Sequence, residues 1–70
     1  MKKICATVSG KVIEFTVDAG DQVGVGDEVL KIESMKMEIP VESEVAGTVA
    51  SILVQAGDDV EEGQVVVELN

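Results

Sequence analysis

The chain lacks several residue types on which active sites and metal centres commonly depend. Its 70 residues include no histidine, tryptophan, tyrosine or arginine, and only one cysteine, one proline and one phenylalanine. Without histidine, the chain has neither the commonest general base nor the commonest metal ligand. Cys5 alone cannot form a disulfide within the chain or a thiolate metal cluster, and we expect it to be a small, partly buried strand residue. These absences argue against an independent enzyme.

The charge of the chain is strongly acidic, with a formal net charge of −9. All five cations are lysines, and the carboxylates are spread along the chain rather than gathered in a tail. Such a surface repels nucleic acids and anionic membranes, so we expect neither as a partner. Acidity also favours a monomer in solution. The N-terminal segment has no apolar run of signal-peptide length, which predicts a cytoplasmic protein.

The chain repeats itself. Residues 4–33 align with residues 41–70 without a gap, at a constant offset of 37. Ten of the thirty aligned positions are identical, among them Gly10/Gly47 and Asp21/Asp58. Because equivalent segments fold alike, we expect a single domain, 1–70, made of two equivalent halves, with a hairpin at 34–40 between them.

Short stretches of alternating apolar and polar residues, separated by glycine-containing turns, predict strands in each half. In the first half they are expected over 4–8, 12–17, around Val23 and over 29–33, with a break at Gly10, and the last strand of the second half is expected over 65–69. Val12, Phe15 and Val17 include a step of three, which predicts a bulge or a strong twist where the sheet curls. No segment has helical spacing.

Four strands in each half predict an all-β fold in which eight strands form two four-stranded antiparallel sheets. The sheets should face each other as a flattened barrel with a pseudo-twofold axis. The hairpin 34–40 has no counterpart in the repeat, since an offset of 37 from Lys36 passes Asn70. By this symmetry, Lys36 should lie at the end of the barrel opposite the two termini.

The hairpin has an unusual sequence for a tight turn. Two-residue hairpin turns favour Asn-Gly because both central residues need positive φ, so a Met35-Lys36 turn would break a local rule. A rule broken once in an otherwise consistent chain points to function. The structural alternatives stay open at this point: Lys36 is an ordinary solvated lysine, as we expect for the other four, and Met35 and Met37 fill gaps in the core.

The run Glu33-Ser34-Met35-Lys36-Met37-Glu38 resembles the biotin-attachment motif Glu-Ala-Met-Lys-Met of the biotinyl/lipoyl attachment domain family, biotin carboxyl carrier type. The resemblance covers the whole chain, because the Ala-Gly-Asp-x-Val turns at 19–23 and 56–60 and the Ala-Gly-Thr-Val stretch at 46–49 also match. It implies a barrel-sandwich hybrid without the thumb insertion of some acetyl-CoA carboxylase carriers. The chain is also similar to small stand-alone biotin/lipoyl attachment proteins, whose motif likewise has serine at the position of Ser34.

The resemblance implies that Lys36 carries biotin through an amide bond, and that biotin protein ligase recognises Glu33, Met35 and Met37. The protein would then carry carboxyl groups between the biotin carboxylase and the carboxyltransferase of a carboxylase or decarboxylase system. It would catalyse neither reaction, and no catalytic or metal-binding residue is implied. One departure is the stretch 6–10, which reads Ala-Thr-Val-Ser-Gly where many members have Ala-Pro-Met-Pro-Gly.

Two alternatives remain open from the sequence. Lipoyl domains share the duplicated barrel and the hairpin lysine but usually have Asp-Lys-Ala at the tip, so lipoate is a second possible cofactor. The same barrel also occurs in interaction modules to which nothing is attached, and those typically lack the Met-Lys-Met tip.

Overall fold

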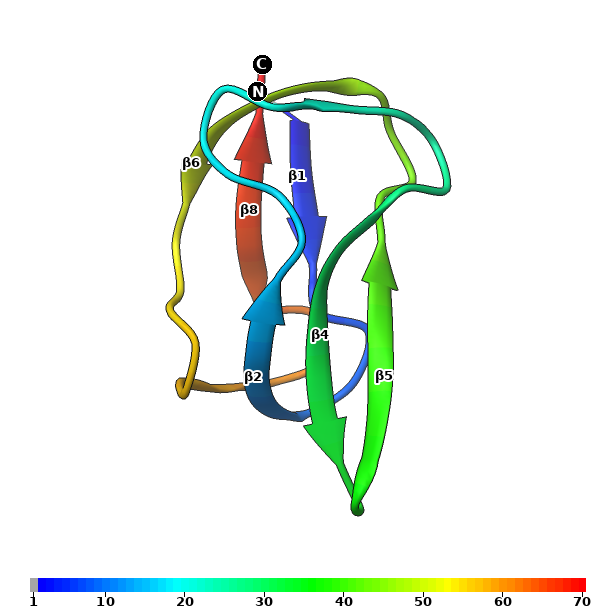
Figure 1. The fold of residues 1–70 in the computed structure, drawn as a ribbon, viewed down its shortest axis with the longest axis vertical. Coiled ribbons are helices and arrows are strands. Elements are labelled where there is room, and N and C mark those ends of the chain that lie inside the picture. The colour runs from blue at the N-terminus through cyan, green and yellow to red at the C-terminus, as the bar shows by residue number, and fades with distance from the viewer. Residues whose placement is uncertain (1) are drawn as a thin grey trace.

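The computed structural model describes residues 2–70, which form eight strands in two antiparallel sheets (Figure 1). One four-stranded sheet has the order β1 (Lys2–Cys5), β8 (Val65–Leu69), β6 (Gly47–Ile52) and β3 (Gln22–Val23). The other has the order β5 (Met37–Glu42), β4 (Glu28–Ser34), β2 (Gly10–Phe15) and β7 (Asp59–Val60). The predicted all-β class is confirmed. Within residues 2–70, no helix is long and apolar enough to cross a membrane.

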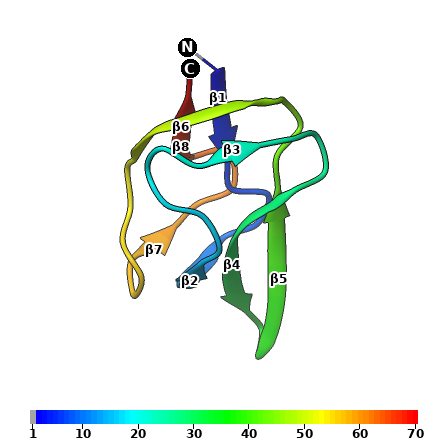
Figure 2. The ribbon, with the colours of Figure 1, turned by 45° about the horizontal axis from the view of Figure 1, so that its top comes forward.

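The two sheets are related by the predicted pseudo-twofold symmetry. Adding 37 to the bounds of β2 and β3 gives the bounds of β6 and β7, and the strand order of one sheet maps onto that of the other. Figure 2 shows the two short strands in their equivalent places, β3 beside β6 and β7 beside β2. The glycine turns repeat as well, with φ of 94° at Gly20 and 96° at Gly57.

The core is aliphatic and draws at least one buried side chain from every strand. Its centre lies along β4 and β8, each an interior strand of its sheet. Val29, Leu30 and Ile32 of β4 are completely buried, as are their equivalents Val66, Val67 and Leu69 of β8. Removal of this apolar surface from water is the main force that holds the sheets together. It also anchors β4 immediately before the hairpin.

A bulge interrupts each of two equivalent strand pairs. The register of β2 against β4 shifts between Val12 and Glu14, and the register of β6 against β8 shifts between Val49 and Ser51. The step of three in the apolar pattern predicted a bulge or a strong twist, and the structure has a bulge there. A bulge increases the local twist of a strand, which lets each sheet curl over the other.

Several predicted details of the first half are wrong. β1 ends at Cys5 although the apolar alternation continues to Val8, because Cys5 is paired with Val65, the first residue of its partner strand β8, and the chain then bends. Gly10 begins β2 rather than interrupting a strand. Cys5 is exposed, not partly buried, because the alternation that turns Ile4 into the core turns its neighbour outward.

The β4–β5 hairpin and the outer ends of β1 and β8 lie at opposite ends of an elongated molecule (Figure 1). The Cα atoms extend over 31 × 19 × 19 Å, and the hairpin projects along the longest axis. Its second strand begins at Met37, so most of the predicted hairpin 34–40 is paired β-structure. The tip is therefore held by a continuous two-stranded ladder.

Candidate functional site

Lys36 lies in a two-residue turn between β4 and β5. The last pair before the turn joins Ser34 to Met37, which leaves Met35 and Lys36 as the two central residues. Their φ angles are 53° and 64°. Positive φ at both central positions is the pattern of a type I′ turn, whose twist suits a hairpin and which normally contains Asn-Gly. The turn that breaks this local rule is present in the structure.

The side chains around the turn face water. Met35 is 92% exposed and Met37 is 62% exposed, while Glu33 and Lys36 also belong to the exposed class. The alternative in which the two methionines fill gaps in the core is therefore wrong. Two unbranched thioether side chains flank the lysine and offer an adaptable apolar contact to a partner.

Two carboxylates face each other at the base of the tip. Glu33 of β4 lies directly opposite Glu38 of β5, and on its other side it is paired with Lys11 of β2. Like charges directly opposite each other on two strands are destabilising. This pair of like charges is a second local feature of the hairpin that does not favour folding. Its β5 member, Glu38, lies two residues after Lys36.

The amine of Lys36 makes no contact that a modification would break. The one ion pair within residues 2–70 joins Lys31 Nζ to Glu14 Oε1 at 3.4 Å, and the side-chain hydrogen bonds found there do not involve Lys36. An exposed amine on a two-residue turn is accessible to an enzyme that acylates it, and its four-carbon stem extends the new group further from the barrel. The residues at the tip therefore fit a covalently attached cofactor.

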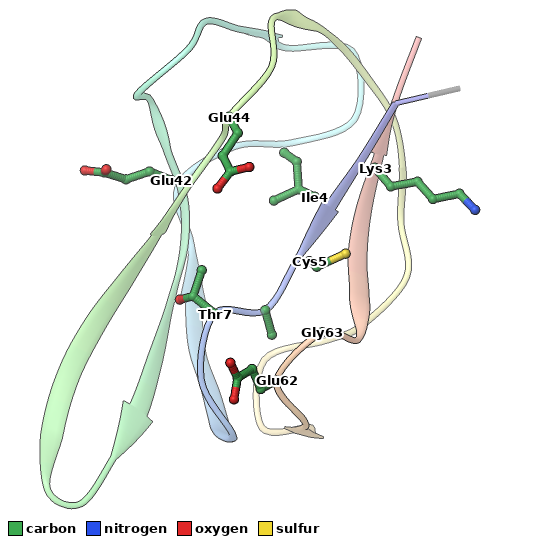
Figure 3. Close-up of a pocket in the computed structure, with 9 residues that line it drawn as sticks. Lys3, Ile4, Cys5, Thr7, Glu42, Glu44, Glu62 and Gly63 are labelled. Carbon is green, nitrogen blue, oxygen red and sulfur yellow. The ribbon is translucent and has the colours of Figure 1, made fainter.

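The surface hollow drawn in Figure 3 lies away from this tip. It is lined by residues 3–7 and by Glu42, Glu44, Glu62 and Gly63, so it includes no residue of the turn. In the part of the chain that the structure describes, no group of three or more acidic or thiol side chains is arranged to hold a metal ion. The site thus consists of one lysine and its flanks on an open protrusion.

A family model described as "Biotin-requiring enzyme" matches residues 3–69. The chain belongs to the biotin/lipoyl attachment family. Members resembling it include the biotinylated protein TB7.3 homolog of Mycobacterium leprae, 44% identical over 87% of this chain and 86% of that protein. The biotin/lipoyl attachment protein of Bacillus subtilis is 43% identical over 90% of this chain and 86% of that protein.

Among solved structures, the urea carboxylase of Kluyveromyces lactis contains a similar domain, with a TM-score of 0.91 and 33% sequence identity. The match covers 99% of this chain and 6% of that much longer chain. The family relationship and this likeness identify the protein as a small domain of the biotin-requiring carrier type, homologous to parts of carboxylases. The relatives that match over most of their own length are named as a biotinylated protein and an attachment protein.

The structure places all four residues predicted from the motif at the tip: Glu33 near the end of β4, Met35 and Lys36 in the turn, and Met37 at the start of β5. Two further residues belong to the same region. The position of Glu38 opposite Glu33 follows from the length of the turn, because a two-residue turn at 35–36 pairs residue 33 with residue 38. Gly10 touches the base of the hairpin, and two signals in the sequence mark it: its identity with Gly47 in the repeat and its match to the glycine of the Ala-Pro-Met-Pro-Gly stretch.

Proposed function

We propose that this protein carries biotin as an amide on Nζ of Lys36 and moves carboxyl groups between a biotin carboxylase and a carboxyltransferase. The observation that carries the proposal is the type I′ turn, in which Met35 and Lys36 both have positive φ at an exposed tip. Local folding preference disfavours these residues there, and membership of a biotin-requiring family supplies the reason for keeping them. The names of the mycobacterial and Bacillus relatives support the same cofactor.

Attachment uses the chemistry of a primary amine. The neutral Nζ forms a C–N bond to the carbonyl carbon of an activated carboxyl group, the activating group leaves with the electron pair of the broken C–O bond, and the nitrogen gives up one proton. The released proton passes to the departing activating group or to water. Biotin protein ligase supplies the activated carboxyl group and, by this proposal, contacts Met35, Met37 and Glu33.

The chain contributes position rather than catalysis to the carboxyl transfer that follows. Biotin, when attached, supplies the ring nitrogen on which a carboxyl group is carried. The β4–β5 ladder holds the base of the arm, while the lysine stem leaves its outer end free to move. A tethered group visits two active sites at a raised effective concentration. By this proposal the carrier works in the cytoplasm as a monomer and its partners are the two carboxylase components.

A second candidate is lipoate on the same lysine. The relative from Bacillus subtilis, whose name includes both biotin and lipoyl attachment, favours keeping this candidate. Both cofactors would be joined to Nζ by an amide, so the geometry of the tip suits either. The choice between them belongs to the ligase that recognises the tip.

The deciding experiment is intact-mass spectrometry of the protein purified from its native host. We expect one added group with the mass of biotin less one water, and its absence in a Lys36→Arg variant. A Lys31→Arg variant is the matched control, because Lys31 is a lysine of the strand β4 that leads into the turn. This variant should still carry the added group on Lys36, like the wild type. A mass increment for lipoate would favour the second candidate. Unmodified protein in cells with active biotin ligase would contradict the first.

A further inference from the structure

A glycine outside the motif controls the base of the hairpin. We propose that Gly10 is a positioning residue, which fixes the direction of the β4–β5 hairpin and thereby the place of Lys36 relative to the barrel. The inference rests on the proposed function of Lys36 and extends it to a residue on another strand.

Gly10 is required for steric reasons rather than for its φ angle. It is the first residue of β2 and is not among the residues with positive φ. A Cβ atom built on it would lie 2.3 Å from the Glu33 carbonyl oxygen and 2.7 Å from Cγ2 of Ile32. Real Cβ atoms do not approach other heavy atoms this closely, so a side chain at position 10 requires β2 and β4 to move relative to each other.

The contact occurs where β4 leaves the barrel. Lys11 and Glu33 are the outermost pair between β2 and β4, whereas the β4–β5 ladder continues to Ser34 and Met37. On the β2 side, the approach of Gly10 to Glu33 is therefore the last contact before the hairpin projects alone. A displacement of the Glu33 carbonyl acts at the base of a lever whose end carries Lys36, three residues further on.

The pseudo-symmetry of the barrel provides a matched control. A Cβ atom on Gly47, the equivalent of Gly10, would lie 2.6 Å from the Asn70 carbonyl oxygen and 3.2 Å from Cβ of Leu69. This conflict is of the same kind but lies at the opposite end of the molecule. Gly24 provides a neutral control, because its nearest neighbour would be Oδ2 of Asp27 at 3.4 Å, near ordinary contact, and its φ is not positive.

The test compares the variants Gly10→Ala, Gly47→Ala and Gly24→Ala, each assayed at a temperature where circular dichroism shows it folded. The first measurement is the kcat/KM of biotin protein ligase for attaching biotin to Lys36. We expect a loss of about tenfold to a hundredfold in Gly10→Ala, since a misplacement of about 1 Å has effects of this size. Gly47→Ala should lose stability but stay within about twofold of the wild type, because its strain lies far from the reacting amine.

The second measurement does not depend on any cofactor. Amide hydrogen exchange over residues 34–38 should change in Gly10→Ala and stay at the wild-type rate in Gly47→Ala, after correction for global stability. If the wild type accepts no biotin, the proposed function fails, yet this exchange comparison still decides the role of Gly10. Equal changes at the hairpin in both variants would make Gly10 merely structural. Wild-type exchange and wild-type loading in Gly10→Ala would overturn the inference.

A double variant covers the case in which Gly10→Ala does not fold. Ile32→Leu removes the β-branch methyl Cγ2 and leaves the Glu33 carbonyl as the principal obstacle to a methyl group on residue 10. In the Ile32→Leu background, Gly10→Ala should show the same loss of loading and the same change in exchange relative to Ile32→Leu alone. Normal loading and exchange in the double variant would contradict the role assigned to the Glu33 contact.

Discussion

The four glycine turns of the barrel and the single hairpin tip solve the same backbone problem differently. Within residues 2–70, positive φ occurs at Gly20, Gly26, Gly57 and Gly63, and otherwise only at Met35 and Lys36. For residues with a Cβ atom, the left-handed region costs roughly 1–2 kcal/mol each, a cost that glycine avoids. The turns that only connect strands thus use the favourable residue, and the turn that carries the lysine does not.

The glycine turns also have side-chain acceptors that the tip lacks. The Asp18 N–H donates to Oδ2 of Asp21 (2.8 Å), and the equivalent Gln55 N–H donates to Oδ2 of Asp58 (2.9 Å). The turns at Gly26 and Gly63 repeat the arrangement with Asp27 and Gln64 as acceptors. Local stability is therefore optimised where a turn has only to fold. The tip instead has two residues with a Cβ atom at positive φ.

The largest effect is expected from giving a glycine turn the type of residue that the tip tolerates. A Cβ atom on Gly57 would meet nothing within 4 Å, so a substitution there tests the backbone conformation alone. We expect Gly57→Ala to lower the free energy of unfolding by about 1 kcal/mol and Gly57→Val by about 2 kcal/mol. Urea unfolding followed by circular dichroism measures both. Unchanged stability in Gly57→Val would remove the contrast between the two kinds of turn.

A smaller loss is expected from removing the acceptor of a glycine turn. Asp58→Ala leaves the Gln55 N–H without its side-chain partner, which should cost about 1 kcal/mol of unfolding free energy. Asp58→Asn keeps an oxygen in a similar place and should lose less than the alanine variant. If both variants match the wild type in urea unfolding, the side-chain acceptors do not contribute to the stability of these turns.

The smallest effect is expected from making the tip resemble an ordinary turn. Met35→Asn places a residue that tolerates positive φ at the first central position, and should raise the free energy of unfolding by about 0.5 kcal/mol. By our proposal it should also slow biotin attachment, because a contact for the ligase is lost. Met35→Leu is the control, since it keeps an apolar side chain without relieving φ. A stabilised variant that is loaded at the wild-type rate would separate the turn conformation from recognition.

Much of the fold could be predicted from the repeat. The errors of the prediction come from effects that the repeat does not show. The offset of 37 predicted two equivalent sheets, and the step of three between Val12 and Phe15 predicted a bulge or a strong twist where the bulge lies. The apolar alternation alone could not show that β1 stops at Cys5, because the stop depends on where its partner strand β8 begins, at Val65. The prediction for Cys5 was wrong because it relied on the general tendency of cysteine to be buried. The alternation of side chains along the strand overrides that tendency.

The residues of the candidate site could be predicted from the sequence, whereas the residue that holds the base of the hairpin could not. Met35 and Lys36 were identified because they depart from the Asn-Gly preference of two-residue hairpin turns. The sequence of the turn itself was therefore sufficient to identify them. By our inference Gly10 acts through its contact with Glu33. The sequence around either residue does not indicate that contact. Its equivalence to Gly47 indicated a shared geometric demand without showing what the demand was.

The sequence by itself determined the class of fold, the pseudo-twofold arrangement and the lysine on which a cofactor is proposed, because periodicity, repetition and turn preference are properties of residues near one another in the chain. Only the tertiary structure decided how the hairpin is held. The close approach of Gly10 to Glu33, the position of Glu38 opposite Glu33 and the exposure of Met35 all depend on which strands become neighbours. Strand pairing is a non-local choice made by burial of the whole core, and it cannot be read from any single segment.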